Sequence, residues 1–207
     1  MVRVKICGIT NSSDAKASIR AGCDALGFVF YRKSARYITP DKANVMIKDL
    51  PKKIKKIGVF VNAKEDYIRR VARLCRLDML QFHGNESVQF CRKFRNHKVI
   101  RAFRVRDKIE LDKISRYRTY AYMFDTFRKD KFGGTGKKFN WNLLKSIDTI
   151  KKIIFLSGGL TDKNVGNAIK LIHPDWIDVS SSVEIRPGKK DHRKLKKFIR
   201  AVKSSAL

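Results

Sequence analysis

The sequence of 207 residues lacks a long hydrophobic run and is poor in cysteine and in acidic side chains. No stretch approaches the roughly 18–20 apolar residues that a membrane-spanning helix needs, and the first residues do not resemble a signal peptide. We therefore expect a cytoplasmic protein without a membrane partner. The four cysteines are not spaced as CxxC and have no histidine close to them in sequence, so we expect no zinc or other metal site.

The scarcity of acidic residues makes the chain strongly basic. Its 48 Lys and Arg stand against 19 Asp and Glu, a formal net charge of +29, and such an excess is typical of proteins that bind nucleic acids. Here, however, the basic residues are spread along the whole chain, without a basic tail, zinc-finger spacing or an RNP-like aromatic strand. We interpret the charge as a solvated basic surface that attracts a small anionic substrate. A nucleic-acid-binding protein stays the rival hypothesis, and it would show salt-sensitive retention of DNA or RNA.

Segments with β-strand patterns alternate with segments of helical periodicity along the whole chain. The first, residues 2–7, alternates apolar and polar side chains as a half-buried strand does. Strands are expected at residues 2–7, 25–30, 57–61, 78–83, 98–103, 120–125, 153–156 and 176–179. Helices are expected at residues 11–21, from Pro40 onward, and around 68–75, 86–94, 108–116, 141–147, 165–172 and 195–202.

Eight strand–helix units without a linker indicate a single α/β domain over residues 1–207. Strands that alternate with helices form parallel sheets with right-handed crossovers. Eight such units fit a closed (β/α)8 TIM barrel better than an open, doubly wound sheet. The open sheet would usually carry fewer strands and would need a glycine-rich turn after the first one.

The predicted strands end in reactive side chains, which a barrel would gather at its mouth. A cysteine such as Cys7 is by itself more often a small buried residue than a catalytic one. Asp125 ends a strand of otherwise apolar and aromatic residues, where a carboxyl group is costly unless it is used or paired. Cys7 and Asp125 would face each other across the mouth, an arrangement that suits proton transfer.

Two segments of small residues follow the seventh and eighth predicted strands, Ser157-Gly158-Gly159 and Ser180-Ser181-Ser182. Small side chains leave backbone N–H groups open, and hydroxyl groups add donors. The loops after these two strands are the usual phosphate site of a TIM barrel. We therefore interpret them as a phosphate site rather than as two tight turns without a ligand.

A series of motifs occurs in order between residues 3 and 191: KICGIT, GFVFYRKSARYITP, GVFVN, LDMLQFHGNE, FDTF, GGTGKKFNW, LSGGL, and IDVSSSVE followed by PGKKD. Together they resemble the phosphoribosylanthranilate isomerase family of tryptophan biosynthesis. The resemblance implies a TIM barrel of the ribulose-phosphate-binding type. It also implies a cofactor-free Amadori rearrangement of N-(5-phosphoribosyl)anthranilate to 1-(2-carboxyphenylamino)-1-deoxyribulose 5-phosphate.

The resemblance also implies roles for single residues. Asp125 corresponds to the general acid that protonates the furanose ring oxygen, and Cys7 to the general base whose thiolate takes the proton from C2 of the sugar. Arg36 is expected to hold the anthranilate carboxylate, for which a planar guanidinium is suited. For His83, structure and substrate positioning are both open. The expected phosphate ligands are Gly158, Gly159, Ser181 and Ser182.

The chain departs from the family pattern in two places. Ser182 takes the place of a glycine, which carries a cost if the position needs a positive φ but adds a hydroxyl donor. The loop at residues 31–38 lacks two prolines. Family members are monomers or homodimers, and both stay open here. The nearest rival enzyme, the aminoaldose isomerase of histidine biosynthesis, pairs two aspartates where this chain has Cys7 and Asp125.

A hypothesis about the thiol follows from the parity of the strands. Lys5 and Cys7 lie two residues apart and therefore share one face of the first strand. The eighth strand must lie beside the first when the barrel closes, and its Asp178 has the parity to meet Lys5. We expect Lys5 and Cys7 to point into the barrel, with a buried Lys5–Asp178 pair beneath the thiol. That pair either directs positive charge toward the thiol or is only structural.

Overall fold

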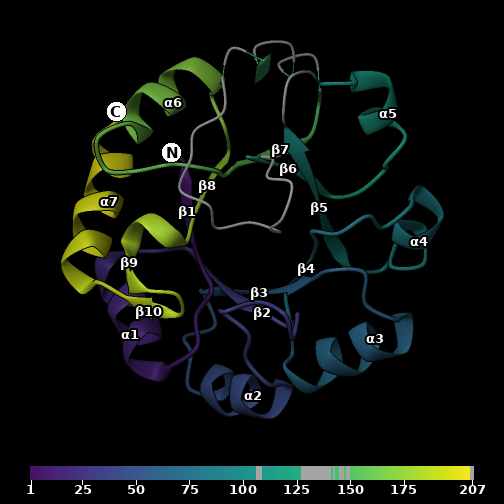
Figure 1. Ribbon diagram of the computed structural model, residues 1–207, viewed down its shortest axis with the longest axis horizontal. Helices are drawn as coiled ribbons and strands as arrows, with labels where there is room; N and C mark the ends of the chain where they lie inside the picture. The colour runs from purple at the N-terminus through teal and green to yellow at the C-terminus, as the bar shows by residue number, and fades with distance from the viewer. Residues whose placement is uncertain (106–108, 127–140, 142, 145–146, 148–149, 206–207) are drawn as a thin grey trace.

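Eight parallel strands close into a barrel, and helices cover its outside (Figure 1). The structure is a computed structural model that describes residues 1–105, 109–126, 141, 143–144, 147 and 150–205. The strands follow one another around the barrel in chain order: β1 (Arg3–Cys7), β2 (Ala25–Val29), β3 (Lys55–Phe60), β4 (Met79–Phe82), β5 (Lys98–Val105), β6 (Ala121–Thr126), β7 (Ile153–Leu156) and β8 (Trp176–Val179). The expected (β/α)8 TIM barrel is confirmed.

The helices lie in the expected segments, and the bounds of α1 and α6 and the start of α2 agree closely with the sequence signals. They are α1 (Ser12–Ala21), α2 (Pro40–Lys48), α3 (Glu65–Leu74), α4 (Val88–Arg92), α5 (Leu111–Ser115), α6 (Val165–Ile172) and α7 (His192–Ser204). Asn11 accepts a hydrogen bond from the Asp14 N–H and caps α1, and Gly22 ends this helix with a φ of 97°. The expected helix at 86–94 is shorter because the hydroxyl of Ser87 caps the backbone N–H of Phe90, so that α4 begins only at Val88.

Apolar side chains fill the inside of the barrel as well as the space between strands and helices. The interior set combines small and large residues: Ala25, Ile57, Met79, Ile100, Ala102, Ala121, Met123, Phe155 and Trp176. Phe155 and Trp176 stack with ring centroids 5.0 Å apart, and the guanidinium of Arg3 lies 4.5 Å from the Trp176 ring. The barrel is therefore a packed core, and its polar residues lie toward the carboxyl ends of the strands.

A short hairpin after β8 was not expected from the sequence. A turn of 3-10 helix, η2 (Ser181–Val183), leads into β9 (Glu184–Arg186), which pairs antiparallel with β10 (Lys189–Lys190). Gly188 has a φ of 80° in the turn between them. The backbone N–H of Lys190 donates to the buried carboxylate of Asp14, so the hairpin is attached to α1 (Figure 1). The Pro187-Gly188 pair was the visible turn signal.

Two expectations remain, one about the segment at residues 133–147 and one about membrane-spanning helices. The glycine-rich motif at residues 133–137 lies outside the described residues, as do several residues of the helix expected at 141–147. Among the described residues, no helix combines the length and the apolar character that crossing a membrane would need.

Strands β1 and β8 close the barrel in the register that parity predicts, with Lys5 opposite Asp178. The Lys5 ammonium donates to Asp178 Oδ1 at 2.7 Å, and the Lys5 side chain is fully buried. Asp178 Oδ2 also accepts from the Ser157 hydroxyl at 3.3 Å, which connects this pair to the end of β7. The buried Lys5–Asp178 pair is thus confirmed.

Removing only the carboxylate of this pair should strongly destabilise the protein. In Asp178→Leu the Lys5 ammonium would stay buried without a counter-charge, and we expect the free energy of unfolding to fall by about 3–5 kcal/mol. The double variant Lys5→Met, Asp178→Leu removes both charges and should lose clearly less. Urea denaturation followed by circular dichroism measures both. A double variant that is as unstable as the single one would contradict this account.

Candidate active site

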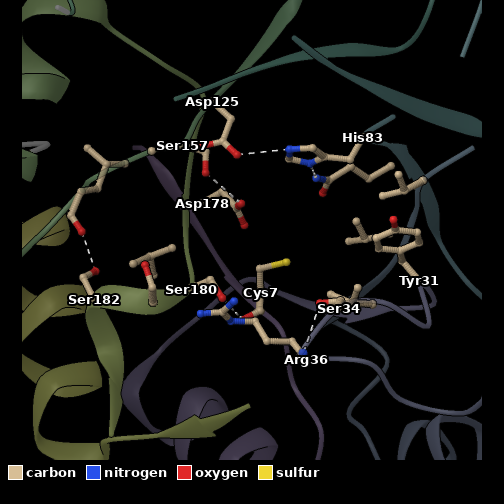
Figure 2. Close-up of a pocket in the computed structure, with 18 of the residues that line it drawn as sticks. Cys7, Tyr31, Ser34, Arg36, His83, Asp125, Ser157, Asp178, Ser180 and Ser182 are labelled. Carbon is tan, nitrogen blue, oxygen red and sulfur yellow. Dashed lines mark hydrogen bonds and ion pairs between the residues drawn. The ribbon is translucent and has the colours of Figure 1, made fainter. Parts of the chain in front are cut away.

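One pocket at the carboxyl ends of the barrel strands gathers all the candidate residues (Figure 2). Its lining includes the two residues expected to transfer protons, Cys7 and Asp125. It also includes the expected substrate ligands, namely Arg36, His83, Gly158, Gly159, Ser181 and Ser182. Figure 2 shows the sulfur of Cys7 extending into the pocket, with Asp125 and His83 on one side of it and Arg36 on the other. The expected gathering of these residues at the mouth is confirmed.

Hydrogen bonds to its carbonyl oxygen and close packing around its sulfur fix Cys7 at the end of β1. Its carbonyl oxygen accepts hydrogen bonds from the Lys190 ammonium at 2.6 Å and from the Ser180 hydroxyl at 3.1 Å. On the neighbouring strand, a side chain in place of Gly27 would bring a Cβ to within 2.8 Å of the Cys7 sulfur. The close packing leaves Cys7 only 8% exposed, inside the pocket.

The charges around the thiol do not keep it ionised by themselves. Burial raises the pKa of Cys7 above the ordinary value of a cysteine, and the nearby carboxylate of Asp178 adds to that shift. The positive charges of Lys5 and Lys190 lower the pKa but do not cancel the effect of burial. Burial also opposes the charge on Lys5, yet Asp178 outweighs it and the pKa of Lys5 is raised. Lys5 therefore supplies positive charge to the thiol, although the thiol form stays favoured.

Arg36 is paired with a carboxylate that sequence analysis did not assign. Its Nε and Nη2 atoms donate to Glu184 at 2.9 and 2.6 Å. Glu184 Oε1 also accepts from the fully buried Lys190 ammonium at 2.8 Å. Burial would raise the pKa of Glu184, but the hydrogen bond from Arg36 and the charge of Lys190 hold it below its ordinary value. The Nη1 donors of Arg36 make no hydrogen bond with a described residue, so they remain available to a ligand anion.

Asp125 faces a pair of polar side chains that come from β4 and its carboxyl end. Asp125 is 3% exposed, and its Oδ2 lies 3.2 Å from His83 Nε2. The other ring nitrogen, His83 Nδ1, lies 2.7 Å from the amide nitrogen of Gln81, which is also 3.2 Å from the sulfur of Met123. The Gln81 carbonyl oxygen is buried without a partner among the described residues, and an unpaired buried carbonyl costs about 1–3 kcal/mol. Gln81 stood in a recognised motif, but nothing in the sequence showed that its amide meets His83.

The two loops expected to bind phosphate present open backbone donors. Gly158 and Gly159 have φ values of 90° and 65°, and their N–H groups make no hydrogen bond within the described residues. The N–H groups of Ser181 and Ser182 likewise have no acceptor there. These four groups line the same pocket, from the ends of β7 and β8.

The serine in place of the family glycine behaves differently from both expectations. Among the described residues, only Asn62, Arg76 and His173 adopt a positive φ without being glycine, so Ser182 carries no such strain. Its hydroxyl donates to the carbonyl of Leu160 at 2.5 Å. The hydroxyl proton therefore joins the two loops and is not an additional donor for a ligand.

The fold and the site together define a barrel enzyme with a buried thiol and a buried carboxyl group facing one pocket. The sequence profile of the family described as "N-(5'phosphoribosyl)anthranilate (PRA) isomerase" matches residues 4–201. The chain belongs to this family of isomerases. It is 44% identical to the N-(5'-phosphoribosyl)anthranilate isomerase of Trichlorobacter lovleyi over 205 residues, which cover 99% of this chain and 100% of that one.

Solved structures of the family are similar over the whole chain. The phosphoribosyl anthranilate isomerase of Thermotoga maritima has a TM-score of 0.93 at 43% identity, covering 99% of this chain and 100% of that one. A phosphoribosyl anthranilate isomerase in complex with reduced 1-(o-carboxyphenylamino)-1-deoxyribulose 5-phosphate has a TM-score of 0.89 at 41% identity, with the same coverage.

The raised pKa of Cys7 predicts slow alkylation at neutral pH. Because the thiolate is the reactive form, the rate of labelling with iodoacetamide should reach its midpoint above the ordinary pKa of a cysteine. Lys5→Met removes a charge that lowers this pKa, so its midpoint should lie higher still. Mass spectrometry of the Cys7 peptide separates it from the other three thiols. Lys16→Met, on the exposed face of α1, is the matched control, and a midpoint that Lys5→Met leaves unchanged would refute the effect.

Proposed function

We propose that this chain catalyses the Amadori rearrangement of N-(5-phosphoribosyl)anthranilate to 1-(2-carboxyphenylamino)-1-deoxyribulose 5-phosphate, a step of tryptophan biosynthesis, without a cofactor. The observation that carries the proposal is the placement of a thiol and a carboxyl group on facing sides of one pocket, in a member of this isomerase family. Acid–base chemistry of this kind needs one group to give a proton and another to take one.

Asp125 acts as the general acid in the first step. It gives its proton to the ring oxygen of the furanose, and the bond between that oxygen and C1 breaks. The electron pair of the anthranilate nitrogen forms the C1=N bond, which leaves a positively charged Schiff base. The support for this role is the burial of Asp125 at the end of β6, opposite Cys7 and beside His83.

Cys7 acts as the general base in the second step. Its thiolate takes the proton from C2, and the electron pair of the C2–H bond forms C1=C2 while the C1=N pair returns to the nitrogen. Tautomerisation of the resulting enolamine gives the ketone. Burial raises the pKa of Cys7, so the thiolate needs positive charge nearby. Lys5 and Lys190 supply part of it, and the positive Schiff base adds the rest. We therefore expect ring opening to precede ionisation of the thiol.

The remaining residues bind the two anionic ends of the substrate. The open N–H groups of Gly158, Gly159, Ser181 and Ser182 suit a phosphate. Arg36, oriented by Glu184, offers its Nη1 donors to the anthranilate carboxylate. The ligand named for the solved relative also carries both a carboxyl group and a phosphate. The excess of basic residues would speed the encounter with such an anion.

The test is an isomerase assay on freshly prepared N-(5-phosphoribosyl)anthranilate. Cys7→Ser and Asp125→Asn should each lower kcat by about 10²–10⁴-fold, the usual contribution of a general acid or base, with little change in KM. Cys75→Ser is the matched control, because Cys75 is buried outside the pocket and a serine can also donate to the carbonyl of Pro40. Thermal melting should show that all three variants are folded. Full activity of Cys7→Ser, or an inactive wild-type protein, would overturn the proposal.

A further inference from the structure

The buried amide of Gln81 determines which nitrogen of His83 carries a proton. Gln81 is 1% exposed inside the barrel, and its amide nitrogen lies within reach of two atoms that carry lone pairs, His83 Nδ1 at 2.7 Å and Met123 Sδ at 3.2 Å. An amide NH2 group has two hydrogens, one for each of these acceptors. The reverse orientation would turn the carbonyl oxygen toward the lone pairs of the sulfur. Gln81 therefore donates to both atoms.

The donation from Gln81 selects the tautomer of the neutral His83 ring. A ring nitrogen that accepts a hydrogen bond carries no proton, so the neutral imidazole holds its single N–H on Nε2. The other neutral tautomer, with its proton on Nδ1, would place one N–H against another. The amide can turn only one of its ends toward His83, which is why the Gln81 carbonyl has no partner within the part of the chain that the structure describes.

The N–H on His83 Nε2 faces the carboxyl group of Asp125. The distance from Nε2 to Asp125 Oδ2 is 3.2 Å, but Nε2 makes no aligned hydrogen bond with a described residue. Hydrogen bonds of this kind commonly align only when substrate is bound. Figure 2 shows the ring and the carboxyl group on the same side of the pocket, with the sulfur of Cys7 further away.

We propose that Gln81 and His83 are positioning residues that prepare Asp125 to act as the general acid. The Nε2–H of His83 bonds to Oδ2, which leaves Oδ1 as the oxygen that carries the acidic proton. When that proton passes to the furanose ring oxygen, the same N–H stabilises the carboxylate that remains. His83 itself neither gives nor takes a proton. This inference rests on the proposed function of Asp125 and assigns a role to a glutamine that otherwise has none.

The first measurement is the tautomer of His83 in the wild-type protein. Nitrogen-15 NMR of histidine-labelled protein distinguishes a neutral ring with the proton on Nε2 from the other two forms, and the signal lost in His83→Gln assigns the residue. We expect the Nε2–H form. In Gln81→Glu a carboxylate of the same shape accepts from Nδ1, so the proton should move there. A wild-type ring that is protonated on Nδ1 would overturn the inference.

Kinetics of Gln81→Glu test whether the tautomer matters for the reaction. We expect kcat to fall at least about tenfold, yet by less than the 10²–10⁴-fold of losing the acid itself, with KM nearly unchanged. A purely structural role would lower thermal stability without this separation of kcat from KM. Wild-type kcat in a folded Gln81→Glu protein with the shifted tautomer would overturn the proposal.

A second pair of variants decides the matter if Gln81→Glu does not fold. The amide nitrogen of His83→Gln can occupy about the place of Nε2, whereas that of His83→Asn lies near the place of Nδ1 and cannot reach Asp125. We expect His83→Gln to keep clearly more of kcat than His83→Asn. Equal activities, or the reverse order, would overturn the proposal. Failure of the proposed function would instead appear as an inactive wild-type protein with the expected tautomer.

Discussion

The ion pair between Lys5 and Asp178 is the contact on which the geometry of the site depends. It lies where β1 meets β8 and closes the barrel, and it fixes the register of these two strands. Cys7 and Ser180 each follow one of the paired residues by two positions, so the same register brings both to the mouth. A shift by one residue would turn Cys7 toward the helices. A buried pair is expensive to desolvate, so its value here is in specifying that register.

The same pair shapes the chemistry above it. Lys5 brings positive charge to Cys7, but Asp178 opposes its effect and burial keeps the pKa of the thiol raised. A thiol in this state stays protonated, and cannot act as a base, until further positive charge arrives. In the proposed reaction the ring-opened Schiff base provides that charge next to C2, where the proton must be taken. The two proton transfers would then follow a fixed order, because the base becomes active only after the acid has acted.

Much of this arrangement could be predicted from local sequence patterns. Alternation of strands and helices gave the barrel, the cap at Asn11 and the glycine at position 22 gave the bounds of α1, and strand parity predicted the Lys5–Asp178 pair. The pairing of Arg36 with Glu184 could not be predicted, since the two residues lie 148 positions apart. Glu184 also belongs to a hairpin whose two strands have only five residues together, too few to show a strand pattern. Lys190, which also bonds to Glu184, could not be distinguished in the sequence from the many surface lysines of a basic chain.

The buried polar groups that sequence analysis missed share a physical pattern. Lys190 is fully buried beside the carbonyl of Cys7, and Gln81 is buried beside His83 with a carbonyl oxygen that has no partner among the described residues. Neither burial is favourable by itself, because one removes an ammonium group from water and the other leaves a carbonyl oxygen without a described hydrogen-bond donor. Lys190 contacts Cys7 directly, and Gln81 is connected to Asp125 through His83. Local cost of this kind is what marks a site whose residues are held for chemistry rather than for stability.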